Sequence, residues 1–323
     1  MKSVCSFIPI CLPIYLAMSF ALLACAGDPG DSVAVNDGEP AATEVRRVSG
    51  HMGAAAALSA ASASELVERR CATRSLTASE VARLDARVAR FERSLRARDR
   101  HHPEHIVIPV AFHVLHAGDA GLLSQADIDD QMAVLNQGFA TTPFRFSLMS
   151  VDYTDNADYF AMNPYSDIEQ VVKNELHVGD ARVLNLYSAS PSDGYLGWSS
   201  LPWDYAANPT DDGVVLLYSS LPGGAAAPYN EGDTATHEIG HWLGLYHTFE
   251  EGCSRRNDRV FDTPAESEPA IGCPVGRDTC QGGGPDPVHN FMNYVDDDCM
   301  DEFTLGQKLR MTASYLLFRF SPL

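Results

Sequence analysis

Basic residues are scarce in this chain of 323 residues, which has 23 Lys and Arg against 43 Asp and Glu and a formal net charge of −20. Nucleic-acid binding draws on cationic side chains that neutralise phosphates, so the acidic surplus argues against nucleic acid as a partner. The shortage is uneven: residues 46–100 hold 12 Arg and 6 acids, a net of +6, whereas residues 101–323 hold 10 Lys or Arg and 32 acids, a net of −22. Opposite charge should therefore draw these two regions together.

Long apolar runs are also lacking, apart from one at residues 7–24. Pro9 and Pro13 interrupt that run and Lys2 precedes it, so we expect a signal peptide over residues 1–25 rather than a membrane span. The sequence thus predicts an exported protein.

Two cleavage patterns compete at the end of this run. Ala24-Cys25-Ala26 fits a small-x-small site, whereas the Leu22 to Cys25 stretch resembles a bacterial lipobox that would make Cys25 a lipid anchor. The protein is accordingly expected to be either secreted or a cell-surface lipoprotein. Residues 26–64 are rich in Ala, Gly, Ser and Asp, which is typical of a flexible linker.

Closely spaced cysteine pairs are missing as well. The C-terminal part has four cysteines, no two closer than seven positions: Cys253, Cys273, Cys280 and Cys299. A four-cysteine zinc cluster is therefore disfavoured. Disulfides are expected instead, because this is an exported segment dominated by Gly, Pro and Asp. Three pairings are possible, and the residues alone do not choose between them.

The chain does contain an eleven-residue motif, HExxHxxGxxH, from His237 to His247. On a helix, His237 and His241 leave the same face and can hold one metal ion, with Glu238 beside them. Gly244 can take a positive φ, so the helix can stop there and bring His247 in as a third ligand. Three imidazoles with an open fourth position suit catalytic Zn²⁺.

A helix that merely carries surface histidines would explain the first five residues of this motif but leave Gly244 and His247 as coincidences. The stretch Asn290 to Tyr294, with Met292 at its centre, looks like the methionine turn that lies beneath the zinc in metzincin metallopeptidases. This second element favours a zinc peptidase.

Together these stretches resemble the pappalysin family of metzincins, and the resembling segments are spread over residues 105–310: 108–114, 212–215, 237–249 and 290–303. The resemblance implies an α/β (α+β) metzincin-type zincin, with a twisted, mostly parallel sheet over the active-site helix and an irregular, disulfide-bonded lower subdomain. It implies a catalytic domain at residues 105–323 that hydrolyses proteins or peptides.

The resemblance also implies roles for particular residues. Tyr294 matches a tyrosine that helps to hold the oxyanion, although it could be a packed aromatic. Asp298 matches an acid at the bottom of the primed-side pocket, which would select Arg, and less so Lys; solvent-facing or calcium-binding aspartates are the alternative. The family pattern pairs Cys253 with Cys280 and Cys273 with Cys299.

Calcium is a further expectation. Asp258, Asp262 and Thr263 offer hard oxygen ligands in one loop, and relatives bind calcium nearby. Acidic surface is the simpler explanation for most of these aspartates.

Residues 65–104 are expected to be a basic pro-segment. Its Arg69 to Thr73 stretch resembles the pappalysin motif in which a cysteine, here Cys71, occupies the zinc of the latent enzyme, although relatives usually have Gly where Ala72 stands. An unpaired thiol is the alternative. We expect activation by a cut before Ile106, in the arginine-rich residues 93–100. Leu84, Val88, Phe91 and Leu95 recur at helical spacing, which an ordinary solvated helix would also show.

The remaining chain alternates between strand and helix patterns, which implies an α/β sandwich. Strands are predicted at residues 106–115, 144–153, 183–187 and 214–218, and helices at 124–139, with a Ser124 and Asp127 capping box, at 166–176 and after Thr304. Thr304 can cap the last helix, which should carry Leu305, Leu309, Leu316 and Leu317.

Two other functions stay open beside a zinc endopeptidase with Glu238 as general base. The chain could be a surface lipoprotein that binds a ligand through an inactive peptidase scaffold, but a pure binding module has no need for Glu238. A hydrolase of non-protein amides is the third alternative.

Overall fold

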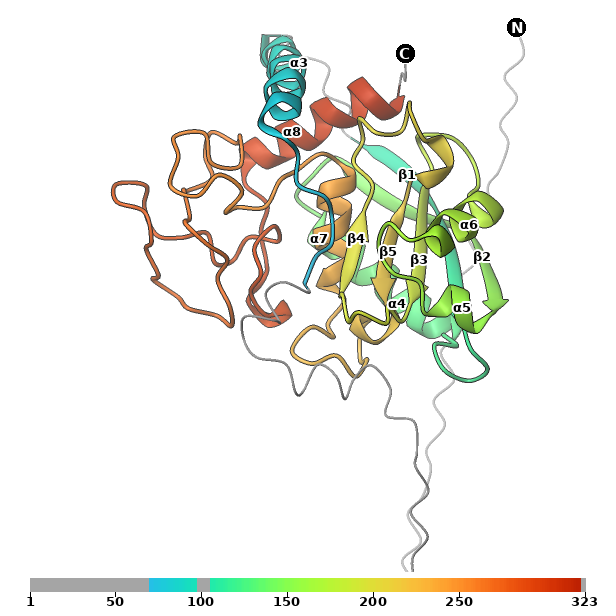
Figure 1. The fold of residues 1–323 in the computed structure, drawn as a ribbon. Coiled ribbons are helices and arrows are strands. Elements are labelled where there is room, and N and C mark those ends of the chain that lie inside the picture. The colour runs from blue at the N-terminus through green and yellow to red at the C-terminus, as the bar shows by residue number, and fades with distance from the viewer. Residues whose placement is uncertain (1–69, 98–104, 321–323) are drawn as a thin grey trace, which may run out of the picture. The chain divides into compact units, whose positions relative to one another are not determined.

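A five-stranded sheet in the order β2-β1-β3-β5-β4 forms the centre of the computed structural model, which describes residues 70–97 and 105–320 (Figure 1). The expected signal peptide, linker and Cys25 lie outside these residues, as do residues 65–69 and 98–104 of the expected pro-segment. All described residues belong to one compact unit, residues 50–323.

Four of the strands were predicted and are confirmed with small shifts at their ends: β1 (Ile106–His116), β2 (Phe144–Asp155), β3 (Leu184–Ala189) and β5 (Val214–Leu217). They pair in parallel, and β4 (Gly197–Ser199) pairs antiparallel to β5 at the edge of the sheet. β4 was not predicted because three residues are too few for an alternation to show.

Helices cover both faces of this sheet. α4 (Gln125–Gly138) and α7 (Asp233–Trp242) contribute to the larger apolar core on one face, while α5 (Ala157–Phe160) and α6 (Asp167–Leu176) pack on the other. The predicted capping box begins α4, since Ser124 Oγ accepts from the N–H of Asp127 and the Asp127 carboxylate accepts from the N–H of Ser124. α7 packs beside β4, which places the motif helix at the edge of the sheet (Figure 1).

The chain after α7 has only a short 3₁₀ helix at Asp297–Cys299 before α8 (Leu305–Ser314), which continues as a π-helical stretch, Tyr315–Phe320. Thr304 caps α8 as predicted. Leu305 is 64% exposed in the first turn of α8, whereas Met311 and Ala313 are buried.

Two disulfides tie the irregular part together, Cys253–Cys280 and Cys273–Cys299. They are the two pairs that the family resemblance implies.

α3 (Ala78–Ala97) lies against α8. Val88 and Leu95 are buried in one cluster with Ala313 and Phe318, so the apolar stripe predicted from the sequence faces the rest of the unit. At its side, Asp85 accepts a 2.9 Å hydrogen bond from Arg310. Among the described helices, none combines the length and apolarity that crossing a membrane requires.

Candidate active site

Three histidines converge at the end of α7. His237 and His241 are one turn apart, and Gly244, with a φ of +96°, turns the chain so that His247 returns to the same point. The Nε2 atom of His241 lies 3.2 Å from that of His237 and 3.0 Å from that of His247. The predicted role of Gly244 as the stop of the helix is confirmed.

The other ring nitrogens fix how these histidines are protonated. Nδ1 of His237 lies 2.7 Å from the Phe291 carbonyl, and Nδ1 of His241 lies 2.9 Å from the Leu245 carbonyl. A carbonyl oxygen only accepts, so each Nδ1 carries the proton and each Nε2 presents a lone pair. Burial, followed by His247, lowers the pKa of His237 to about 3, which keeps its ring neutral.

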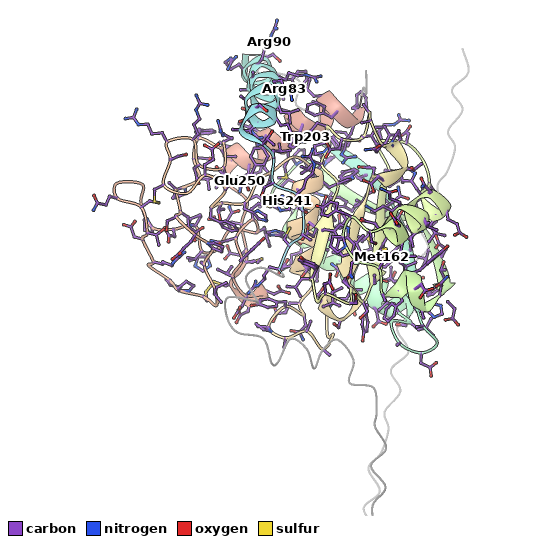
Figure 2. The ribbon with its side chains drawn as sticks, viewed as in Figure 1. Arg83, Arg90, Met162, Trp203, His241 and Glu250 are labelled. Carbon is purple, nitrogen blue, oxygen red and sulfur yellow. A yellow bond between two sulfur atoms is a disulfide. The ribbon has the colours of Figure 1, made fainter. Side chains whose placement is uncertain are left out.

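This arrangement fits a zinc ion. Neutral imidazoles whose Nε2 lone pairs point together at 3.0–3.2 Å repel one another unless a cation lies between them. A tetrahedral zinc with bonds of 2.0–2.1 Å holds its nitrogen ligands about 3.4 Å apart, close to the observed spacing. His247 Nδ1 lies 3.6 Å from the Glu250 carboxylate, a further anchor in the irregular segment, and Figure 2 shows His241 between that segment and the sheet.

Met292 lies beneath this site. It is fully buried, and a Cβ on Gly240 of α7 would come within 2.4 Å of its Sδ, so only glycine permits this approach. The Asn290 side chain accepts from the N–H of Met292 at 3.0 Å, and the Met292 carbonyl accepts from the N–H of Thr248 at 3.2 Å. The methionine turn is thereby tied to the residue after the third histidine.

Glu266 strengthens that tie and was not found from the sequence. Its buried carboxylate accepts from Thr248 Oγ1 at 2.9 Å and from the Asn293 amide, and it pairs with Arg277 at 2.6 Å. Only tertiary contact could reveal it, because it stands alone among polar residues of the irregular segment.

Tyr294 lies above the histidines. Its ring centre is 5.0 Å from that of His247 and 5.8 Å from that of His237, and it lines a small cavity together with Glu238. Burial, followed by Cys71 and Glu238, raises its pKa well above the ordinary value, so the phenol stays protonated and can donate.

Cys71 faces the same point from the other side. Its Sγ and the ligand nitrogens of His237, His241 and His247 all lie within 4.8 Å of one another. The thiol also lies 3.5 Å from Glu238 Oε2, and burial, followed by Glu238, raises the pKa of Cys71. The sequence-predicted cysteine and histidines are thus brought together.

The segment that carries Cys71 also forms a hydrogen bond to Glu238. Thr73 Oγ1 donates to Glu238 Oε2 at 2.9 Å and accepts from the N–H of Ser199 in β4 at 2.8 Å. Burial raises the pKa of Glu238 to about 8, while the hydrogen bonds from Cys71 and Thr73 act in the opposite direction. The N–H of Ala72 donates to the Gly197 carbonyl at 3.0 Å, so this segment lies beside the edge strand and parallel to it.

Arg70 lines a small cavity beside His237. Its guanidinium donates to the Val295 carbonyl at 2.7 Å and to the Tyr229 hydroxyl, and it lies 3.5 Å from the Asp296 carboxylate. Burial lowers the pKa of Arg70 to about 9, and Asp296 and Asp297 oppose that shift. Neither Arg70 nor Thr73 was assigned a role from the sequence.

The acid of this cavity differs from the one expected. Asp298 is exposed, whereas Asp297 is buried and lines the cavity. Asp297 and Asp298 lie in one 3₁₀ turn that begins after Asp296. A 3₁₀ turn points consecutive side chains in different directions. Asp297 is turned inward, and its carboxylate accepts from the N–H of Glu231 at 2.9 Å.

The three residues expected to hold calcium are not equivalent. Asp258 Oδ2 and Thr263 Oγ1 are buried without a hydrogen-bond partner, as is Asn257 Oδ1. Asp262 instead accepts from Thr304 Oγ1 at 2.8 Å and from the N–H of Gly306 at 2.9 Å, so it caps α8.

Comparison with known proteins gives concordant matches. A family model described as pregnancy-associated plasma protein-A matches residues 183–315. An extracellular metalloprotease of the fungus Coccidioides posadasii is 41% identical over 220 residues, 66% of this chain and 78% of that protein. A promirolysin mutant from Tannerella forsythia has a TM-score of 0.63 and 27% identity over 76% of this chain and 94% of its own. Mature mirolysin of the same organism, in complex with a cleaved peptide, has a TM-score of 0.55 and 29% identity over 64% of this chain and 90% of its own.

These matches extend well beyond the histidine motif. The fungal relative shares two fifths of its residues over most of its length, and the promirolysin match covers 76% of this chain. The metzincin fold and the metallopeptidase class expected from the sequence are confirmed. The chain belongs to the pappalysin family of zinc metallopeptidases.

Proposed function

We propose that the chain is an exported zinc endopeptidase made as a latent precursor. The observation that carries this proposal is the position of Cys71, whose Sγ meets all three ligand histidines while its neighbour Thr73 binds Glu238. Extracellular relatives support export. The precursor of mirolysin aligns with 76% of this chain and the mature form with 64%, which supports a pro-segment here.

His237, His241 and His247 would hold the zinc ion, which when bound polarises the substrate carbonyl and acidifies a water molecule. Glu238 acts as general base: it takes the proton of the attacking water and passes it to the leaving amine. Departure of residues 70–73 would expose the Glu238 carboxylate to water. That exposure removes part of the burial that raises its pKa, and so populates the ionised form that a base requires.

The remaining groups hold the substrate. The edge strand β4 offers the Gly197 carbonyl, which now accepts from Ala72, to the backbone of a peptide. Tyr294 is placed to donate its phenol to the developing oxyanion, next to the histidines.

We assign the primed-side pocket to the small cavity beside His237 together with the place that the Arg70 guanidinium now occupies. A guanidinium there meets the Val295 carbonyl, the Asp296 carboxylate and the ring of Tyr229, whose centre lies 3.4 Å away. Asp297 takes the role that the sequence assigned to Asp298. The enzyme should therefore cleave before Arg, and less so before Lys, because a planar guanidinium can use all of these contacts at once.

Calcium belongs to the proposal as a second ion. Asn257 Oδ1, Asp258 Oδ2 and Thr263 Oγ1 are hard oxygen atoms buried without partners, and such atoms are explained by an ion that they bind.

Digestion of casein by the processed protein tests the proposed function. Glu238→Ala should lower the rate about 10²–10⁴-fold while bound zinc stays at one ion per chain, since the histidines are unchanged. Glu268→Ala, which removes an exposed carboxylate, is the control and should keep full activity. Residual cleavage that is equal in all three proteins, or that survives a zinc chelator, would contradict the proposal.

A further inference from the structure

Tyr165 stands in the turn between α5 and α6, outside every motif described above. Its φ of +60° is a left-handed conformation that residues other than glycine rarely adopt, and the residue is 59% exposed. Such a conformation persists only where the surroundings hold it, and it is found mostly at functional sites.

A buried carboxylate holds this turn against the edge strand. Glu169 of α6 accepts at 2.5 Å from the N–H of Tyr165 and, through its other oxygen, at 2.5 Å from the indole N–H of Trp198 in β4. The ammonium of Lys173 lies 2.7 Å from the same carboxylate, and both side chains are buried. One fixed group thus sets the distance between Tyr165 and β4.

The hydroxyl of Tyr165 is aimed at the chain that lies along β4. It donates to the carbonyl of Ala72 at 2.5 Å, while the N–H of Ala72 donates to the Gly197 carbonyl at 3.0 Å. Ala72 is therefore held from two directions through backbone hydrogen bonds, and its methyl group packs against the apolar cluster that includes Trp198. Neither hydrogen bond uses the side chain of Ala72, so a peptide of another sequence that places a carbonyl at this point can accept from the Tyr165 hydroxyl.

The positions of Arg70, Cys71 and Ala72 along the cleft indicate which part of a substrate would reach the Tyr165 hydroxyl. Arg70 lies in the pocket assigned to the residue after the cut, Cys71 faces the histidines, and Ala72 is the next residue, beside Gly197 of β4. A peptide whose basic residue enters that pocket has its N-terminal part where Ala72 now lies.

We propose that Tyr165 is a substrate-binding residue of the mature enzyme, whose hydroxyl donates a hydrogen bond to a peptide carbonyl on the N-terminal side of the cut. The inference rests on the proposed endopeptidase function. In this proposal, the α5–α6 turn forms the side of the substrate-binding cleft opposite β4.

Tyr165→Phe tests this because it removes the hydroxyl and keeps the ring. In the processed enzyme, KM for a peptide with three residues before the cut should rise about two- to tenfold, the worth of one neutral hydrogen bond, with kcat unchanged. The rise should vanish for peptides that begin at the residue supplying the cleaved carbonyl.

Tyr159→Phe is the matched control. Its hydroxyl donates to Glu175 at 2.6 Å, in the same part of the fold but away from Ala72. An unchanged KM in Tyr165→Phe, with kcat intact, overturns the inference and leaves the endopeptidase standing, as does an equal rise in Tyr159→Phe. A processed wild-type enzyme that cleaves no peptide overturns the endopeptidase proposal, and this inference with it.

Discussion

At the residue scale, the packing of the zinc-binding helix on the methionine turn depends on a position that has no side chain, Gly240. A Cβ added to Gly240 would lie 2.4 Å from the Sδ atom of Met292. Met292 is fully buried, so its side chain has no room to move aside. The fit between helix and methionine turn therefore depends on this one glycine.

Gly240→Ala should lower the free energy of unfolding by about 1–3 kcal/mol, because overpacking outweighs the better helix propensity of alanine. Chemical denaturation of the processed protein measures it. Combining Gly240→Ala with Met292→Ala should restore part of the loss relative to the sum of the single changes, because the second change removes the obstructing sulfur. Strict additivity would show that the two residues are not in contact.

The pair Asp297 and Asp298 offers a second test at this scale, because adjacent aspartates face opposite ways. Asp297→Asn should lower kcat/KM for peptides with Arg after the cut at least about tenfold, because Asp297 adds to Asp296 a buried negative charge that favours a cationic side chain in this pocket. Asp298→Asn, on the exposed side, should change neither rate nor preference. Loss of preference in Asp298→Asn alone would restore the original sequence interpretation.

At the scale of elements, the loop with Asn257, Asp258 and Thr263 is the proposed calcium site, and its stability should depend on pH. Burial raises the pKa of Asp258 to about 7 in the folded protein, against an ordinary 3.8. The folded state thus keeps a proton that the unfolded chain has lost. This contribution to stability is fully present below pH 3.8 and disappears as the pH rises to about 7.

In calcium-free buffer, the stability of the wild type relative to Asp258→Asn should therefore fall between pH 4 and pH 7.5. Calcium should restore it at the higher pH, because the ion favours the carboxylate. Thermal unfolding at both pH values measures this. Asp262→Asn, which weakens the cap of α8, should be less stable in all four conditions. If calcium raised the unfolding temperature equally in wild type and Asp258→Asn, Asp258 would not be a calcium ligand.

Helix α3 is the element that anchors the segment with Cys71. Val88→Ala empties part of its contact with Ala313 and Phe318 and should weaken it by about 1–3 kcal/mol. Uncut precursor should then gain activity, up to about tenfold for each 1.4 kcal/mol lost. Arg90→Ala, an exposed position at the outer end of α3 in Figure 2, is the control. No difference between the two precursors would show that α3 does not restrain the site.

For the whole molecule, the sequence predicts those features that repeat or that carry chemistry at fixed spacing. The apolar runs predict β1 and β5, the capping boxes predict α4 and α8, and the eleven-residue motif predicts the converging histidines. Each depends on residues that are near in the chain.

Other features depend on distant contacts and were out of reach. Glu266 and Tyr165 matter through what the fold brings beside them, and no local pattern marks either one. The sequence could not show that Asp297 is buried and Asp298 exposed, because the direction of a side chain in a 3₁₀ turn is set by its neighbours, here Glu231.

The central claim is that residues 70–97 keep a competent zinc endopeptidase latent through Cys71. Its most direct test is the rate of peptide cleavage by one preparation before and after it is cut between residues 98 and 105, with Cys71→Ala precursor alongside. Uncut wild type should be nearly inactive and the cut protein fully active. Cys71→Ala precursor should lie between them, because Arg70 and Thr73 still occupy the pocket and Glu238. An uncut wild-type precursor that cleaves peptide at the rate of the cut protein would contradict the account.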